Sequence, residues 1–356
     1  MSIYWNKRTK NLSPYVPGEQ PRDRKFIKLN TNENPYPPSP KVIEAIQKAA
    51  GNELRLYPDP SCMAFREAAA ARYGVKPEQV FAGNGSDEVL AFAFGAFFDA
   101  HTAILFPDIT YSFYPVYANL WDIPYRTVAL SDDFSINTDD YKVYSGGVIF
   151  PNPNAPTGKA VPLSDILLLA KYLATNEKVL IIDEAYAAFG ADSAVPHIGE
   201  YPNLLTVHTL SKSASLAGLR LGFAIGSEEL IEGLCRIRDS FNSYTVDRLA
   251  LAGGAAALSD AAYYEDINRR VIATRERVSQ ALRSLGFSFL PSAANFIFMK
   301  APSLSGADFF AALRERGILA RYFNRERIAD YLRVSIGTDQ EMDVFLGVCG
   351  ELVGSL

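Results

Sequence analysis

The stretch VLIIDEAYAAFG, residues 179–190, begins with four apolar residues and then turns acidic at Asp183. An unbroken apolar run of this length is typical of a strand covered on both faces of a sheet. Similar runs recur as QVFAG (79–83), TAILF (102–106), YRTVAL (125–130), GVIF (147–150), LLTVHTL (204–210) and RLGFAIG (220–226). Helical patterns separate several of them, notably residues 86–98 and 163–175. The alternation predicts an α/β fold with a mostly parallel seven-stranded sheet between helices.

The composition and the pattern of predicted elements change twice along the chain. Residues 1–40 are rich in proline and asparagine and predict an extended N-terminal arm. Residues 41–240 carry the alternating strands and helices, and we expect them to form a large cofactor-binding domain. Residues 241–356 begin with long helical patterns and continue with strands such as ANFIFMK (294–300), which predicts a smaller α+β domain. We expect the arm to pack with the small domain or with a partner subunit.

Composition excludes several classes of protein. The chain has 356 residues and a net charge of −5, so it lacks the broad basic surface expected of a nucleic-acid partner. Its three cysteines form no CxxC pair, which argues against a zinc site or a disulfide scaffold and suits the cytoplasm. The first fifteen residues lack the apolar core of a signal peptide, and no apolar run approaches the roughly 20 residues of a membrane span. Three histidines leave few candidates for a metal site, and we expect none.

Several polar residues follow predicted strands, where open α/β sheets bind their ligands. Gly85, Ser86 and Asp87 open a helix after a strand, so their backbone N–H groups would hold a phosphate; a tight turn capped by Asp87 is the alternative. Tyr111 would stack on a flat ligand or be an ordinary half-buried tyrosine. Asn154, in the proline-rich loop NPNAPTG, would be a fixed hydrogen-bond donor or part of a structural turn.

Lys212 stands among serines and small apolar residues in TLSKSASLAG, and Ser211 and Arg220 flank it. A desolvated amine is a neutral nucleophile, whereas the alternative is a surface lysine with its stem along the protein. Asp183 ends a buried strand, where it would meet a cation or cap a helix, and Tyr186 follows three residues later. Asp183 and Lys212 are one βα crossover and a strand apart, so both would lie at one sheet edge. An amine, an acid, a phosphate cradle and a stacking ring together suit pyridoxal phosphate.

The sequence resembles the pyridoxal-phosphate aminotransferases of fold type I along nearly the whole chain. The segments that carry the resemblance are NPNAPTG (152–158), IIDEAY (181–186) and TLSKSASLAGLRLGF (209–223). Further segments resemble the histidinol-phosphate aminotransferases: LSPYVPG (12–18), KLNTNENPYPPSP (28–40), LYPDP (56–60), GNGSDE (83–88), ANFIF (294–298), ILARYF (318–323) and YLRVSIGT (331–338). The resemblance implies conversion of histidinol phosphate and 2-oxoglutarate to imidazole-acetol phosphate and glutamate, in histidine biosynthesis.

The resemblance also implies roles for single residues around the cofactor. Lys212 would hold it in a Schiff base and move the proton between substrate Cα and cofactor C4′. Asp183 would pair with the pyridinium nitrogen, Tyr186 and Asn154 would hydrogen-bond the phenolate oxygen, and Tyr111 would stack on the ring. The phosphate would be held by Gly85, Ser86, Asp87, Thr209, Ser211 and Arg220. In most of these enzymes an asparagine directly precedes the proline of the PTG loop, whereas this chain has Ala155 there, so Asn154 takes the role or the contact is missing.

Other implied residues concern the substrate and the partner. Tyr57 would reach the cofactor phosphate of the partner subunit, which makes a homodimer part of the mechanism. Arg333 would clamp the α-carboxylate of glutamate. Arg321 would bind the phosphate of histidinol phosphate, with Tyr15 and Asn34 nearby; surface ion pairing is the alternative for both arginines.

Three rival functions stay open at this stage. Aromatic amino-acid aminotransferases share most of these motifs, and a decarboxylase of a phosphorylated amino acid has the same fold. A non-catalytic module that binds a phosphorylated ligand belongs to a different class, but it has no need of both Asp183 and Lys212.

Overall fold

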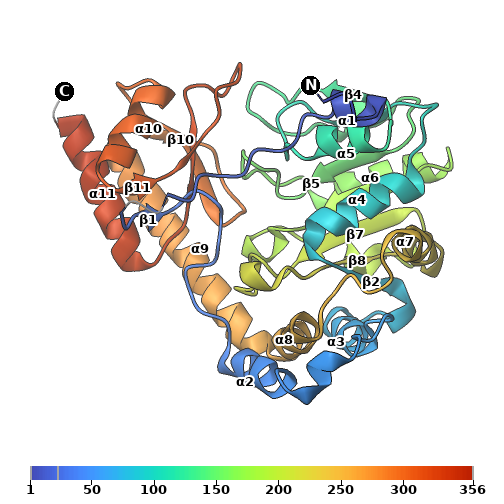
Figure 1. Ribbon diagram of the computed structural model, residues 1–356. Coiled ribbons are helices and arrows are strands. Elements are labelled where there is room, and N and C mark those ends of the chain that lie inside the picture. Colours follow the sequence, from blue (N-terminus) through green and yellow to red (C-terminus); the bar gives the residue numbers. More distant parts are fainter. Residues whose placement is uncertain (1, 22–23, 355–356) are drawn as a thin grey trace.

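The computed structural model describes residues 2–21 and 24–354 (Figure 1). Within these residues the large sheet has seven strands in the order β2-β8-β7-β6-β5-β3-β4. They are β2 (Val80–Gly83), β3 (Ile104–Pro107), β4 (Tyr125–Val128), β5 (Val148–Pro151), β6 (Leu180–Asp183), β7 (Leu204–Thr209) and β8 (Gly222–Ile225). Neighbouring strands run parallel except at β8, which is antiparallel to β2 and β7. Each predicted apolar run therefore forms a strand of one mostly parallel sheet.

Helices cover both faces of this sheet. Since successive residues of each strand point to opposite faces, neighbouring residues pack against different helices. On one face, Ile149 and Ile181 pack in a core with residues of α4 (Gly85–Phe97), α5 (Tyr114–Leu120) and α7 (Glu228–Phe241). On the other face, their neighbours Phe150 and Ile182 pack against α6 (Leu163–Ala174). The continuous apolar runs of the sequence follow from this burial on both sides.

A second layer lies beyond β2 and β8. There α8 (Arg248–Ser259) packs against α2 (Pro40–Ala49) and α3 (Met63–Tyr73), as Figure 1 shows below the sheet. Helix α3 ends at Gly74, whose φ of +70° gives the left-handed C-cap that glycine adopts without strain.

The C-terminal part is built on a separate four-stranded antiparallel sheet of order β12-β13-β10-β9. Its core is apolar and lies between this sheet and three helices. The elements of this part are α9 (Ala261–Ser284), β9 (Ser288–Phe289), β10 (Phe296–Lys300), α10 (Gly306–Glu315), β11 (Ile318–Leu319), β12 (Arg321–Tyr322), β13 (Leu332–Ser335) and α11 (Asp339–Gly354). Short 3-10 segments occur at Asn52–Arg55, Pro77–Gln79, Thr138–Tyr141, Ala187–Phe189, Val195–His197 and Ala217–Leu219.

The N-terminal arm contacts both parts of the molecule. Its helix α1 (Lys7–Asn11) carries Arg8, which forms an ion pair with Asp122 of the large part. Its strand β1 (Ile27–Lys28) pairs in parallel with β11 of the small part. The long helix α9 also runs from one part to the other (Figure 1). Since α8 packs with α2 and α3, we propose that the domain boundary lies along α9 rather than at residue 241.

Candidate active site

A cavity of about 410 Å³ lies where β5, β6 and β7 end and where the arm passes between the two parts. Polar residues from the sheet edge, the arm and the small part line it together. Among them are Tyr15, Thr31, Asn32, Ser86, Asp87, Tyr111, Asp183, Tyr186, Thr209, Ser211, Lys212, Arg220 and Arg333. Most of the side chains singled out in the sequence thus meet in one place, as the ends of neighbouring parallel strands require.

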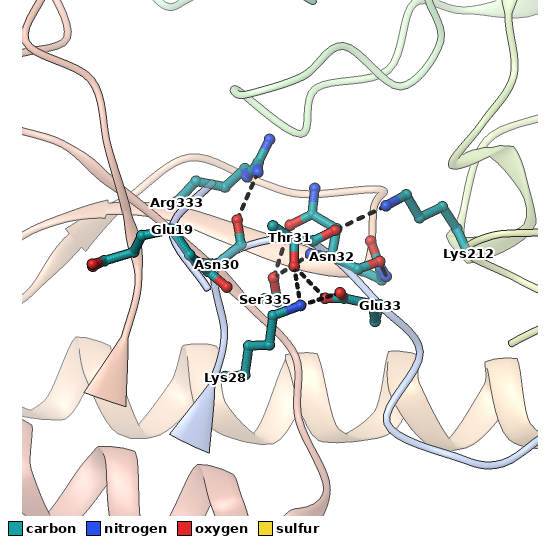
Figure 2. Close-up of polar contacts among 10 residues, drawn as sticks. Glu19, Lys28, Asn30, Thr31, Asn32, Glu33, Lys212, Arg333 and Ser335 are labelled. Carbon is teal, nitrogen blue, oxygen red and sulfur yellow. Dashed lines mark hydrogen bonds and ion pairs between the residues drawn. The ribbon is translucent and has the colours of Figure 1, made fainter. Parts of the chain in front are cut away.

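Lys212 follows β7 and points its amine toward the arm (Figure 2). Its Nζ donates a hydrogen bond of 2.8 Å to the backbone carbonyl of Thr31. Burial lowers the pKa of Lys212 to about 8, because a charged ammonium loses hydration there. The lysine is therefore not a snorkelling surface residue, and about a tenth of its amine is neutral at pH 7, far more than for an ordinary lysine.

Asp183 is the last residue of β6 and is only 4% exposed. Its carboxylate accepts hydrogen bonds from the Ala185 backbone N–H at 3.1 Å and from the Tyr114 hydroxyl at 3.2 Å. Burial raises the pKa of Asp183 to about 6, and no ion pair reaches this carboxylate within the described residues. A buried acid without a cation of its own suits a ligand that brings one.

The predicted phosphate cradle is formed by the start of α4 and the segment after β7. Asp87 accepts hydrogen bonds from the Arg220 guanidinium at 3.0 Å and from the Tyr111 hydroxyl at 2.7 Å. The Thr209 and Ser211 hydroxyls, both buried, are joined by a 3.0 Å hydrogen bond. The backbone of α4 approaches β8 so closely that a Cβ on Gly222 would lie 2.3 Å from the Ser86 nitrogen.

Tyr114 is a member of the site that the sequence analysis missed. It is fully buried at the start of α5, where its hydroxyl donates to Asp183 and its ring packs edge-on against Tyr111, centroids 5.7 Å apart. Nothing local distinguishes it from the other tyrosines of the chain, so only the fold brings its hydroxyl to the carboxylate.

The loop NPNAPTG turns Asn154 away from the cavity. The Asn154 carboxamide donates to the Ile109 carbonyl at 3.0 Å and to the Thr157 hydroxyl at 3.1 Å, and it accepts from the Thr110 hydroxyl at 3.0 Å. Ala155, and not Asn154, lies on the cavity wall. Of the two alternatives for this loop, the structure favours the missing contact, because the carboxamide of Asn154 is already engaged by its own surroundings.

The arm between Asn30 and Asn34 makes contacts that the sequence analysis did not predict (Figure 2). Besides Thr31, which accepts from Lys212, the carbonyl of Asn30 accepts from Arg333 at 3.1 Å. Asn32 donates to the Tyr186 hydroxyl at 3.0 Å. Asn34, predicted near the substrate, instead donates to the Lys212 carbonyl at 3.1 Å and does not line the cavity.

Two arginines approach the cavity from the small part. Arg333 lies opposite Arg321 in the β12–β13 ladder, so both side chains leave the same face of the sheet. Burial lowers the pKa of Arg333, and the nearby charge of Arg321 lowers it further. The buried Nε of Arg333 has no hydrogen-bond partner within the described residues. Arg321 itself does not line the cavity and donates to the Val16 carbonyl at 3.4 Å.

Of two predicted aromatic residues, only Tyr15 lines the cavity. Tyr15, on the arm, lines the cavity and stacks on Phe113, with ring centroids 4.3 Å apart. Tyr57 lies outside the cavity and is 79% exposed. Its ring stacks on that of Tyr244, with centroids 4.6 Å apart.

The residues of the cavity fit pyridoxal phosphate. Lys212 provides a partly neutral amine, and Asp183 is a buried acid with no cation paired to it. Arg220, which is paired with Asp87, offers a phosphate a cradle of guanidinium, hydroxyl and N–H groups together with Ser211 and the start of α4. The amine of Lys212 thus suits the aldehyde of the cofactor, the carboxyl of Asp183 suits its pyridinium nitrogen, and the cradle suits its phosphate.

Comparisons with known proteins agree with this fit. The family model for aminotransferase class I and II matches residues 24–348. The histidinol-phosphate aminotransferase of Clostridium acetobutylicum is 56% identical over 353 residues, which cover 99% of this chain and 100% of the relative. Histidinol-phosphate aminotransferase 1 of Bordetella parapertussis is 53% identical over 358 residues, covering 100% of both chains.

Solved structures share the fold. The histidinol-phosphate aminotransferase of Sinorhizobium meliloti, in complex with pyridoxal-5'-phosphate, matches with a TM-score of 0.89. The match covers 100% of this chain and 99% of that chain at 23% sequence identity. The fold class predicted from the apolar runs and from the resemblance is confirmed.

Proposed function

The chain belongs to the aminotransferase class I and II family, and on that premise we propose that it transfers an amino group from histidinol phosphate to 2-oxoglutarate. The products are imidazole-acetol phosphate and glutamate, in a step of histidine biosynthesis, and the cofactor is pyridoxal phosphate. The observation that carries the proposal is that one cavity gathers the amine of Lys212, the carboxyl of Asp183 and the guanidiniums of Arg220 and Arg333.

Lys212 and Asp183 carry the chemistry in this proposal. When bound, pyridoxal phosphate supplies an aldehyde for a Schiff base and a ring that withdraws electrons from the substrate. Lys212 binds the cofactor through its amine and, once released, moves the substrate Cα proton as general base and acid. Its pKa of about 8 keeps enough neutral amine for this role near neutral pH. Asp183, which has no cation of its own, holds a proton on the ring nitrogen.

The remaining cavity residues bind and orient. Arg220, Ser211, Thr209 and the start of α4 bind the cofactor phosphate, and Tyr111 packs against the ring. Tyr186 donates a hydrogen bond to the ring oxygen. We do not assign Asn154 to the cofactor, since its carboxamide is engaged within its own loop.

For the substrates, we propose that Arg333 binds the α-carboxylate of glutamate through its unpartnered Nε. Arg321, on the same face of the small sheet, binds the phosphate of histidinol phosphate after giving up the Val16 carbonyl. Tyr15 lines the cavity from the arm beside them. Asn34 supports the backbone of Lys212 and is not assigned to the substrate.

We further propose a homodimer in which Tyr57 reaches the cofactor phosphate of the partner subunit. The dimer is supported by exposed apolar side chains at and beside Tyr57, which a monomer would leave in water. They are Leu54 and Leu56 in the same segment, Tyr57 itself, and Tyr244, which stacks on it. Mixing a Tyr57→Ala variant with a Lys212→Ala variant should restore activity, because hybrid dimers contain one site with both native residues. Activity that stays at the level of the separate variants would contradict shared sites.

A cytoplasmic location is also proposed, since Cys62, Cys235 and Cys349 are all free. Within the described chain, no helix combines the length and the apolar character needed to cross a membrane. Separating the membrane and soluble fractions of lysed cells that carry the native gene, followed by activity assays, tests the location.

The function is tested by spectral titration of the protein loaded with pyridoxal phosphate. Histidinol phosphate should remove the visible cofactor band, and 2-oxoglutarate should restore it, whereas tyrosine and phenylalanine should act weakly. Lys212→Ala should abolish both changes, and Lys171→Ala, at an exposed position on α6, should leave them intact. A band that only the aromatic amino acids remove, or carbon dioxide release without use of 2-oxoglutarate, would overturn the proposal.

A further inference from the structure

Asn32 is a buried and tightly hydrogen-bonded residue of the arm. It is 1% exposed, and its φ of +57° lies in the left-handed region, which asparagine enters more readily than most residues. Its backbone carbonyl accepts from the Asn295 side chain at 3.0 Å, and its backbone N–H donates to the Ser335 hydroxyl at 2.9 Å. The backbone of Asn32 is thus held by residues from two strand ends of the small part.

The chemistry of these groups fixes the direction of each hydrogen bond. The backbone N–H of Asn32 can only donate, so the Ser335 oxygen accepts and its own proton goes to Asn32 Oδ1, 2.8 Å away. With Oδ1 engaged by Ser335 (Figure 2), the amide nitrogen of Asn32 is the end that faces Tyr186, at 3.0 Å. An amide nitrogen is a donor only. The Tyr186 oxygen must therefore accept, and its single proton points elsewhere.

We propose that Asn32 is a positioning residue that turns the phenolic proton of Tyr186 into the cavity. Tyr186 lines the cavity, and its ring is fixed edge-on against Phe296, with centroids 5.2 Å apart. Because the ring cannot swing away and one side of the oxygen is occupied by Asn32, the proton is presented to the cofactor ring. The inference rests on the proposed function, in which Tyr186 donates to the ring oxygen.

The direction of the Tyr186 hydroxyl matters more in this chain because the cavity wall at residue 155 provides no second hydrogen-bond donor to the ring oxygen of the cofactor. Ala155 places a methyl group there, and the carboxamide of Asn154 is engaged with Thr110 and Thr157. A hydrogen bond from Asn32 also polarises the Tyr186 O–H and strengthens it as a donor. The hydrogen bond from Asn32 on the arm thus both orients the Tyr186 O–H and makes it a stronger donor.

The test exchanges the donor end of Asn32 for an acceptor. In Asn32→Asp, a carboxylate of nearly the same shape accepts the Tyr186 proton and draws it away from the ring oxygen. Without that donor, the linkage to Lys212 keeps its proton to higher pH, so the pH midpoint of the cofactor absorbance change should rise by about one unit. Tyr186→Phe should raise it similarly, and the double variant should show no further rise.

Two more variants keep the test decisive. Ser335→Ala releases the Asn32 carboxamide to rotate, and the midpoint should rise in the same direction even if Asn32→Asp fails to fold. Asn203→Asp is the control, because it makes the same chemical change at a carboxamide that donates only to the Ala170 and Lys178 carbonyls. The pH midpoint of the absorbance change should stay unchanged in this variant.

The outcomes separate the two levels of the argument. A protein that gives no visible band with pyridoxal phosphate would reject the proposed function itself. A normal band whose midpoint is unchanged in both Asn32→Asp and Ser335→Ala would reject the positioning role alone. Additive shifts in the Asn32→Asp, Tyr186→Phe double variant would also reject it, because Asn32 would then act by another route.

Discussion

Replacing Asp183 by asparagine should stabilise the cofactor-free protein near pH 8 while lowering its transaminase activity. Burial raises the pKa of Asp183 from 3.8 to about 6, so the folded chain holds this proton more tightly than the unfolded chain. Folding stability therefore falls as pH rises from about 4 to about 6 and stays low above that range. Asparagine carries no charge and removes this loss.

The magnitude follows from the size of the pKa shift. A shift of about two units, at about 1.4 kcal/mol each, corresponds to about 3 kcal/mol near pH 8. Near pH 5 part of the carboxyl is still protonated in the folded protein, and the gain should be about half as large. The asparagine oxygen can still accept from the Ala185 N–H, while its amide nitrogen would face the Tyr114 hydroxyl, which would have to turn and accept instead of donating.

Urea unfolding of the cofactor-free protein at the two pH values measures this effect. Asp192→Asn, at an exposed position, is the matched control and should not change stability. After loading with pyridoxal phosphate the order should reverse, since only ionised Asp183 pairs with the pyridinium nitrogen. An asparagine variant that is less stable than the native chain near pH 8, without cofactor, would refute the reasoning.

Three more predictions concern single features of the site. The rate at which the cofactor-free protein takes up pyridoxal phosphate should rise with pH, reach half its maximum near pH 8 and level off above about pH 9, because burial lowers the pKa of Lys212 to about 8. Stopped-flow absorbance whose rate still climbs above about pH 10 would contradict it. Gly222→Ala should weaken cofactor binding at least about tenfold by equilibrium titration, since its Cβ would lie 2.3 Å from the Ser86 nitrogen, whereas Gly218→Ala, with nothing within 4 Å, should bind normally. Arg321→Ala should raise KM for histidinol phosphate about tenfold or more and leave KM for glutamate nearly unchanged; an equal rise for both would remove Arg321 from phosphate recognition.

The sequence predicted the parts of the site that depend on strand order. Asp183 and Lys212 could be placed at one edge because apolar runs mark strands, and parallel strands end at the same edge. Ser86 and Asp87, in the glycine-rich turn between a strand and a helix, reach the same cavity for the same reason, and their binding of a phosphate stays a prediction. These inferences need only local patterns and one rule of topology.

The arm could not be predicted in the same way. Asn32 and Ser335 are 303 residues apart, and neither position carries a pattern that points to the other. Asn32 stands in a segment rich in asparagine and proline, where each residue equally suits an ordinary turn. Asn154 shows the converse, because its motif suggested a ligand contact while its carboxamide is engaged within the loop.

The crossing of the arm between the two parts has a consequence for the order of folding. A contact that closes a loop of 303 residues costs more chain entropy than the local pairing of neighbouring strands, so it forms after both parts have gained structure. During synthesis the arm emerges before β13, so their contact cannot form until β13 has also been made. Until then, the carbonyl of Thr31 and the amide of Asn32 are not held against Lys212 and Tyr186. The surroundings of Lys212 are thus complete only after β13 has joined the arm.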